Sequence, residues 1–379
     1  MGLLYTGSIS NPSTRLPELE GLRAVAALGI VVTHVSFQTA LGSAFLERFD
    51  YFVAVFFALS AFLLARSTHG RGYYRRRLAR IAPGYLVCVS VVMVALPALS
   101  GISLRQILAN LFLVQVYVPD GLVAGLTHMW SLCIEVAFYL ILPAYLALRT
   151  RGRIAALIVA VVCSVVWPWL IDVPSPLNLQ TTPPSYVPWF AVGLVCAEVE
   201  RYRLVRQGRN LRWIGPLLGL AVAWLASREW VGPRGLVHPS PAEFNARILL
   251  GTVFAACFLV PFALWPAKGR SVLSSAVATA LGKWSYGIFL WHVAVLDIAF
   301  PVLGVRVFSG RPVDFVLVLA FTVAVSVAVA YVSYELVEKP ASRWIRRDWP
   351  TPRTQPAQSQ ENHPHNSPPA TVPGPATAP

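Results

Sequence analysis

Two residues that could do chemistry lie in the first apolar stretch of the sequence, where ionisable side chains are costly. Arg23 and His34 are eleven residues apart, which is about three helical turns, so both project from one side of a helix with the histidine about 16 Å further along the axis. The unperturbed pKa of histidine suits proton transfer near neutral pH. His34 is therefore a candidate general base; the alternative is a structural hydrogen bond to a neighbouring helix.

A carboxylate in a later apolar stretch is the second candidate. Glu135 lies in HMWSLCIEVAFYLILP, seven residues after His128 and four before Tyr139. This spacing places the three side chains on one face of a helix. Since this stretch and the first one run in opposite directions, we expect Glu135 to lie at the depth of His34 and to orient or charge its ring. A purely structural pair between helices is the alternative.

The third candidate is the basic segment RGYYRRRLARIAP, which contains Arg76, Arg77 and Arg80. Guanidinium groups bind phosphate oxygens through two parallel hydrogen bonds. Such a cluster at a membrane surface could hold the phosphates of a nucleotide-like donor. From composition alone, anchoring of the chain to the membrane surface explains these arginines better.

A last histidine, His292, forms an H-x4-D pattern with Asp297. Residues five apart on a helix diverge by about 140°, so the pattern predicts no catalytic pair. We expect His292 to pack in the core or to form a wall of a binding site. Nucleophile elbows, P-loops, HExxH motifs and paired cysteines are absent from the sequence, which predicts no covalent nucleophile, no metal and no permanently bound cofactor.

The elements that must position these residues are membrane helices. Hydrophobic residues make up 56% of the 379, charged residues 13%, and the mean hydropathy is +0.60, whereas soluble domains contain about 25% charged residues. The pattern predicts an all-α, polytopic membrane protein with about ten spans. These are Leu22–Ala40, Phe49–Ala65, Ile81–Leu99, Met129–Leu148, Ile154–Ile171, Tyr186–Val199, Trp213–Ala226, Ile248–Trp265, Trp284–Leu303 and Val313–Val332. The shorter segment Leu104–Val118 is expected to be re-entrant or interfacial.

Basic residues are distributed unevenly over the two sides that these spans define. With a cytoplasmic N-terminus, 24 of the 31 Lys and Arg residues fall on the cytoplasmic side. This asymmetry predicts a cell-membrane protein with both termini in the cytoplasm. Contact with anionic lipid explains the net charge of +14, so we expect the bilayer and no nucleic acid as a partner.

Three regions follow from this organisation. Residues 1–20 form a cytoplasmic N-terminal segment and residues 21–347 the membrane domain. Residues 348–379 are rich in Pro, Ala and Ser, with almost no large apolar side chains. Such a composition cannot bury a core, so the cytoplasmic tail is predicted to be disordered.

Taken together, the motifs resemble those of the membrane acyltransferase-3 family, from about Leu16 to Arg347. ELEGLRAVAALGIVVTH resembles the family's R-x10-H motif, with Arg23 and His34 in register, and RRRLARIAP its R-x-x-R element at Arg77 and Arg80. MWSLCIEVAFYLILP is similar to its W-S-L-x-x-E-x-x-F-Y block, and SYGIFLWHVAVL and YELVEKPASRW to its late motifs. The order and spacing of the set make the resemblance specific.

The resemblance implies a ten-helix domain that transfers an acyl group, commonly acetyl, from cytoplasmic acyl-CoA to a hydroxyl. The implied acceptor is a sugar, glycan, glycolipid or glycosylated metabolite, as for macrolide and sugar O-acyltransferases. His34 would be the catalytic histidine, and Arg77 and Arg80 would hold the CoA phosphates. The family often has a second acidic residue after the glutamate, where this chain has Val136. With only a tail after the last span, a stand-alone transferase is implied.

The remaining roles are assigned on this scheme. Glu135 or Tyr139 would orient the base or stabilise its imidazolium, and Arg23 and Arg76 would join the arginine pair at the donor. Trp130, Ser131 and His292 would contact substrate, and the oxyanion donor would be Ser131, Tyr139 or His292. A multi-pass transporter is the alternative function, although the sequence shows no internal symmetry of the kind common in transporters. A structural membrane scaffold is a third reading.

Overall fold

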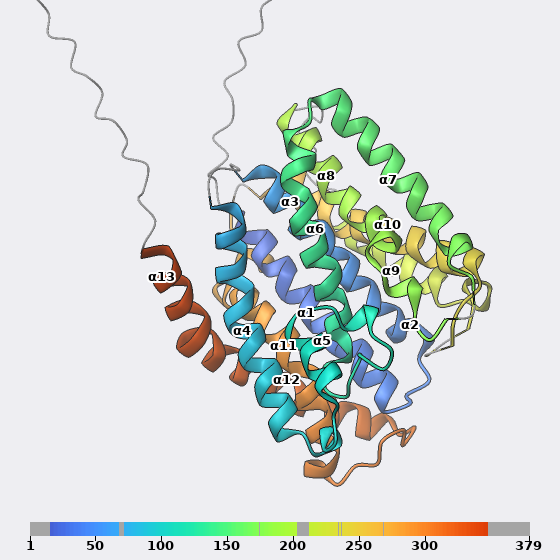
Figure 1. Ribbon diagram of the computed structural model, residues 1–379, viewed down its shortest axis with the longest axis vertical. Coiled ribbons are helices and arrows are strands. Elements are labelled where there is room, and N and C mark those ends of the chain that lie inside the picture. Colours follow the sequence, from blue (N-terminus) through green and yellow to red (C-terminus); the bar gives the residue numbers. More distant parts are fainter. Residues whose placement is uncertain are drawn as a thin grey trace, which may run out of the picture.

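The computed structural model shows a bundle of helices (Figure 1). It describes residues 16–67, 72–173, 175–202, 212–233, 235, 237–267 and 269–347, and these include no β-strand. The helices are α1 (Pro17–Gln38), α2 (Ala44–Glu47), α3 (Phe52–Arg66), α4 (Tyr73–Ala95), α5 (Leu104–Leu111), α6 (Trp130–Ala147), α7 (Thr150–Leu170), α8 (Val187–Arg201), α9 (Ile214–Ala226), α10 (Pro241–Leu264), α11 (Ala276–Leu303), α12 (Pro312–Ser333) and α13 (Lys339–Arg347).

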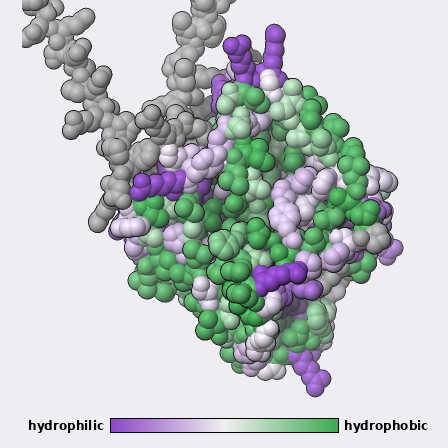
Figure 2. All heavy atoms as spheres, in the orientation of Figure 1, coloured by the Kyte–Doolittle hydropathy of each residue, from purple (hydrophilic) through white to green (hydrophobic). Residues whose placement is uncertain are grey.

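The all-α polytopic fold is confirmed. In the described part of the chain, eight helices are long and apolar enough to cross a membrane, and apolar side chains cover much of the face shown in Figure 2. The other two predicted spans coincide with α8 and α9, which have 15 and 13 residues, so the total of ten crossings stays a prediction. α5 has eight residues and is too short to cross, as expected for this segment.

Helix α1 packs against α3, α11 and α12 (Figure 1), so its two predicted site residues, Arg23 and His34, are half-buried in the bundle. Glycines allow the close approach. A Cβ atom on Gly29 would lie 2.0 Å from the ring of Phe52, and one on Gly21 would lie 2.0 Å from the carbonyl oxygen of Leu273. Any side chain at these two positions would push α1 away from its neighbours.

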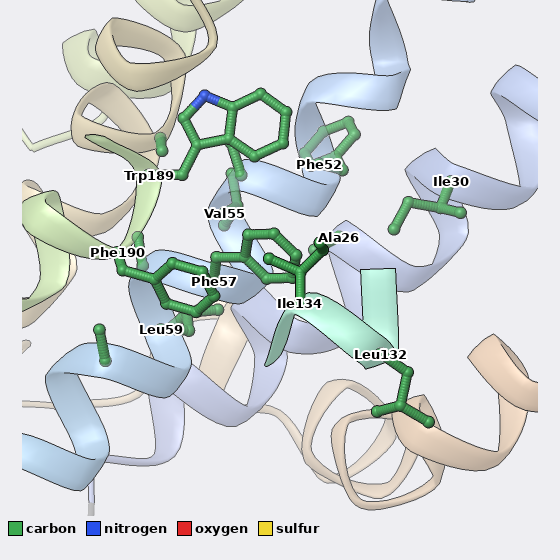
Figure 3. Packing of buried hydrophobic residues seen from close by; sticks show 14 of the residues in the cluster. Ala26, Ile30, Phe52, Val55, Phe57, Leu59, Leu132, Ile134, Trp189 and Phe190 are labelled. Atoms are coloured by element: carbon green, nitrogen blue, oxygen red, sulfur yellow. The ribbon is translucent and has the colours of Figure 1, made fainter. Parts of the chain in front are cut away.

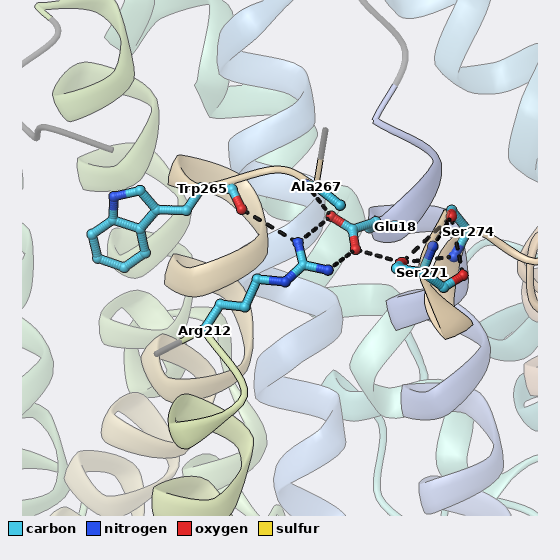
Figure 4. A network of polar contacts seen from close by, with 6 residues as sticks. All are labelled: Glu18, Arg212, Trp265, Ala267, Ser271 and Ser274. Carbon is cyan, nitrogen blue, oxygen red and sulfur yellow. Dashed lines mark hydrogen bonds and ion pairs between the residues drawn. The ribbon is translucent and has the colours of Figure 1, made fainter. Parts of the chain in front are cut away.

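The start of α1 is fixed by a buried carboxylate (Figure 4). Glu18 accepts two hydrogen bonds from Arg212, at 2.9 and 2.6 Å, one from the Ser271 hydroxyl at 2.5 Å, and one from the backbone N–H of Ala267 at 2.8 Å. These bonds satisfy the carboxylate almost completely. They tie α1 to the segment before α9 and to the loop between α10 and α11.

Aromatic side chains fill the core between α3, α6 and α8 (Figure 3). The ring of Phe190 is stacked between Phe57 and Phe138, with centroids 4.4 and 4.3 Å away. Helices α3 and α8 meet closely at Gly193, where an added Cβ would lie 2.1 Å from the carbonyl oxygen of Ala58 and 2.7 Å from the backbone nitrogen of Phe62. Because these neighbours are backbone atoms, they cannot rotate away.

Two sequence predictions fall on segments that the structure does not describe. Most of the N-terminal segment, residues 1–15, and the tail at 348–379 lie outside the described residues. The expected disorder of the tail therefore stays a prediction.

Replacing Gly193 with valine is expected to separate α3 from α8 and to lower the free energy of unfolding by about 1–3 kcal/mol, because the new side chain overlaps backbone. Thermal unfolding of the purified protein in detergent measures the change. Gly269→Ala is the control, since an added Cβ there has no atom within 4 Å. Equal midpoints for the two variants would contradict the close contact at Gly193.

Candidate functional site

Three histidines from separate elements meet beside α1. Nδ1 of His34 lies 2.9 Å from Nε2 of His292 on α11, and their ring centroids are 5.0 Å apart. His128, from a short 3-10 turn at Thr127–Met129 before α6, has its ring centroid 4.6 Å from that of His292 and 6.2 Å from that of His34. Tertiary packing thus gathers histidines that are 94 and 164 residues apart in the chain.

The three rings differ in accessibility and in their partners. His292 and His128 are 0% and 3% exposed, whereas His34 is only half-buried. His292 Nδ1 lies 2.8 Å from the carbonyl oxygen of Phe289, and His128 Nε2 lies 2.8 Å from that same oxygen. His34 is therefore the most exposed of the three rings, while the other two share one backbone carbonyl as a hydrogen-bond partner.

Glu135 belongs to a different cluster, so the expected contact with His34 was wrong. Its Oε1 accepts hydrogen bonds from the Tyr139 hydroxyl, at 2.5 Å, and from the Ser60 hydroxyl. His128, rather than Glu135, is the residue of this segment that lies beside His34. Seven residues further along, Glu135 is displaced by about 10 Å towards the Arg23 end of α1.

Arginines surround this second cluster. The guanidinium of Arg23 interacts electrostatically with Glu135, Tyr139 and Arg80, and that of Arg77 with Tyr139. Nε of Arg23 and Nε of Arg77 are buried and have no hydrogen-bond partner among the described residues. Buried guanidinium donors without partners are costly, which makes these two arginines candidates for contact with an anionic ligand.

The other predicted donor-site arginines lie at the edge of this cluster. Arg80 is exposed and Arg76 is half-buried on the same helix, α4. The structure thus brings four predicted arginines to one end of α1 and α4. It places the predicted base, His34, towards the other end of α1.

The predicted substrate-binding residues lie near His128. Trp130 packs on Tyr186, with ring centroids 5.0 Å apart. The Ser131 hydroxyl is buried and donates to the carbonyl oxygen of His128 at 3.1 Å. That bond occupies its proton, which weakens Ser131 as an oxyanion donor.

The sequence interpretation missed or undervalued three residues. His292, expected to be a wall or packing residue, bonds directly to His34. His128 was noted only as a neighbour of Glu135, although its place just before the W-S-L motif was a signal. Ser60 donates a hydrogen bond to Glu135, but it lies in an apolar run of the sequence that gives no signal of this contact. Asp297 bonds to Gln38 at 3.2 Å, which agrees with the absence of a His292–Asp297 pair.

A separate cavity of about 780 Å³ lies where the end of α9 meets the start of α10 and the residues around Arg48. Its lining includes Arg228, Trp230 and Arg247 and contains none of the predicted site residues. Over the ranges that the structure describes, no group of three or more His, Cys, Asp or Glu residues is arranged to hold a metal ion.

Comparison with known proteins identifies the family that the chain resembles. The family model described as an acyltransferase domain, acyltransferase-3, matches residues 16–331. Acyltransferase MdmB of Streptomyces mycarofaciens is 30% identical over 383 residues, which cover 89% of this chain and 94% of that protein. Nodulation protein 10 of Rhizobium leguminosarum bv. viciae is 26% identical, with 77% and 82% covered.

A longer relative is the "Putative peptidoglycan O-acetyltransferase YrhL" of Bacillus subtilis (strain 168). It is 28% identical, with 86% of this chain and 54% of that protein covered, so the chain spans about half the length of that relative. No solved structure matches the chain.

Removing the Tyr139 hydroxyl is expected to destabilise the protein, because the half-buried Glu135 would lose one of its two hydroxyl donors. Tyr139→Phe should lower the free energy of unfolding by about 1–3 kcal/mol, as for hydrogen bonds to charged groups. Chemical denaturation in bicelles measures the difference. The control is Tyr145→Phe on the same helix, whose hydroxyl forms no hydrogen bond to a described residue. A smaller loss for Tyr139→Phe than for the control would contradict the assigned bond.

Proposed function

Because this chain belongs to the acyltransferase-3 family and is an O-acyltransferase, we propose that it transfers an acyl group from acyl-CoA to a sugar hydroxyl, with His34 as the general base. The acyl group is acetyl in this proposal, which agrees with the O-acetyltransferase name of one relative. The acceptor is a glycan, a glycolipid or a glycosylated metabolite.

One observation carries the proposal: Arg23 and His34, one from each of two polar clusters, lie on a single stripe of α1. Arg23 and His34 are eleven residues apart, which is about 16 Å on a helix. Acyl-CoA has phosphates at one end and its thioester at the end of a long, slender pantetheine arm. A ligand of this shape can contact both clusters at once.

The arginine cluster is the proposed donor-phosphate site. Arg77 and Arg80 carry exposed or half-buried guanidinium groups on the first turns of α4, and Arg76 precedes Arg77. Deeper in, Arg23 has a buried Nε that no described residue contacts through a hydrogen bond. We assign the paired hydrogen bonds to phosphate to Arg77 and Arg80, and guidance of the pantetheine arm to Arg23.

Glu135 and Tyr139 take a different role from the one expected. They lie beside Arg23 and Arg77 rather than beside His34. The carboxylate balances the positive charge of the arginines, and the Tyr139 hydroxyl holds the carboxylate in place. Both residues thereby position the donor site and do not touch the reacting atoms.

The proposed chemistry is one acyl transfer without a covalent enzyme intermediate. His34 removes the proton of the acceptor hydroxyl while the oxygen attacks the thioester carbonyl. The tetrahedral intermediate collapses, the C–S bond breaks, and the proton on His34 passes to the departing thiolate. The products are the O-acyl ester and free CoA thiol, and His34 is neutral again.

The proposed orientation follows from the charge asymmetry of the sequence. Both termini and the arginine cluster would face the cytoplasm, where acyl-CoA is found, with the protein in the cell membrane. His34 would then lie in the outer half of the bilayer.

Replacing His34 with alanine is expected to lower acyl transfer by about 10²–10⁴-fold, the usual contribution of a general base. Membrane vesicles from cells that express the protein are given radiolabelled acetyl-CoA, and label in glycans, lipids and metabolites is counted. The control is His238→Ala, which changes an exposed loop residue. Full incorporation by His34→Ala at equal protein level would refute the assignment of the base.

Replacing Arg77 with alanine is expected to weaken binding of the acyl donor and to leave the rate of the chemical step nearly unchanged. Loss of a charge-assisted bond to phosphate costs about 1.5–3 kcal/mol, so the KM for acetyl-CoA should rise about 10- to 100-fold, with a much smaller change in kcat. The same vesicle assay with varied acetyl-CoA measures both constants. Arg151→Ala removes an exposed arginine of α7 and should leave both unchanged. An unchanged KM in Arg77→Ala would place the phosphates elsewhere.

A further inference from the structure

We infer that His292, held by the carbonyl oxygen of Phe289, is a positioning residue that fixes His34 in the tautomer whose Nε2 carries the free lone pair. This inference rests on the proposed role of His34 as base and names the device that prepares it. Along one chain of contacts, the hydrogen-bonding capacity of each atom fixes where the next proton lies.

The chain begins at an atom that can only accept. The carbonyl oxygen of Phe289 lies 2.8 Å from Nδ1 of His292, and that of Ile288 lies 3.2 Å from the same nitrogen. Since a carbonyl has no proton, Nδ1 of His292 must donate. In a neutral ring the other nitrogen, Nε2, then carries the lone pair.

The next contact transmits this choice to the base. Nε2 of His292 lies 2.9 Å from Nδ1 of His34. Because Nε2 accepts, Nδ1 of His34 donates and holds the ring proton. The lone pair of neutral His34 is therefore on Nε2, the nitrogen not engaged with His292. A general base needs a free lone pair to take a proton, and in this tautomer Nε2 of His34 has it.

A charged His292 would reverse the second bond, but its surroundings disfavour one. The ring is 0% exposed, and the titratable groups that interact with it are His128 and His34, with no carboxylate among them. A buried cation without an anionic partner is costly. The neutral arrangement is the one that the site stabilises.

His128 strengthens the anchor from the other side. Its Nε2 lies 2.8 Å from the Phe289 oxygen and must donate to it. That oxygen thus accepts a hydrogen bond from each of two histidines. Phe289 and His292 lie on α11, which packs directly on α1, so the oxygen is fixed relative to His34.

The arrangement resembles a catalytic triad in which a neutral histidine, His292, takes the place of the aspartate that orients the base. In serine proteases an aspartate orients the histidine and stabilises the imidazolium. Here the Nε2 lone pair of His292 performs the orienting step, and its dipole favours the proton on Nδ1 of His34. A neutral ring suits the apolar bundle, because a carboxylate at this position would need a cation as partner.

Two substitutions at His292 separate positioning from packing. The amide oxygen of His292→Gln can take the place of Nε2 and accept from His34, whereas His292→Phe keeps the ring volume and cannot accept. In the vesicle assay His292→Gln should keep kcat within about 10-fold of wild type, and His292→Phe should lose about 10²–10⁴-fold, with the KM for acetyl-CoA unchanged in both. His238→Phe is the control. If His292→Phe is as active as His292→Gln, or more active, His292 serves packing and the inference falls.

A measurement that needs no turnover tests the tautomer itself. The protein is labelled with ¹⁵N-histidine and placed in lipid nanodiscs, and its NMR spectrum is compared with that of His34→Ala to identify the His34 signals. We expect a protonated Nδ1 and an unprotonated Nε2 in wild type and in His292→Gln, and a mixture of tautomers in His292→Phe. A wild-type His34 protonated on Nε2 would overturn the inference. If wild type shows this tautomer but never transfers acetyl, the proposed function fails and the positioning stands.

Discussion

The structure depends on one constraint: polar groups inside an apolar bundle must find their partners within the protein, because lipid supplies none. Three clusters described above meet this constraint through hydrogen bonds within the protein. Glu18 receives four hydrogen bonds at the start of α1, Glu135 receives two hydroxyls in the middle of α6, and His128 and His292 share the oxygen of Phe289.

Some buried polar atoms have no hydrogen-bond partner among the described residues, and Nε of Arg23 and Nε of Arg77 are two of them. His34 is half-buried, although both its neighbouring histidines are covered. Partnered polar groups give the bundle its geometry. In the proposed function, Arg23, Arg77 and His34 are the groups that contact substrate. Arg23 and His34 lie on α1, which packs closely against its neighbours at Gly21 and Gly29.

The clusters follow one another along one helix. The clamp at Glu18 fixes the start of α1, the arginines with Glu135 and Tyr139 follow, and the histidines come last. In the proposed function, a long substrate is bound by charge at one end and reacts at the other. Acyl transfer needs the thioester carbonyl held close to the acceptor oxygen, and a rigid helix that carries Arg23 and His34 on one stripe fixes the distance between the phosphate site and the base.

The sequence by itself determined the fold class and the main helical segments, because hydropathy and helical periodicity are local properties of the chain. It also singled out Arg23, His34, Arg77 and Glu135 as candidate site residues. Only the tertiary structure decided which of them meet. Glu135 pairs with Ser60 rather than orienting His34, and His292 bonds to a ring 258 residues away. The depth of a side chain in the bundle and the neighbour that it faces depend on how far each helix is shifted along and rotated against the helices beside it. That is set by side-chain packing between distant segments, which no local pattern encodes.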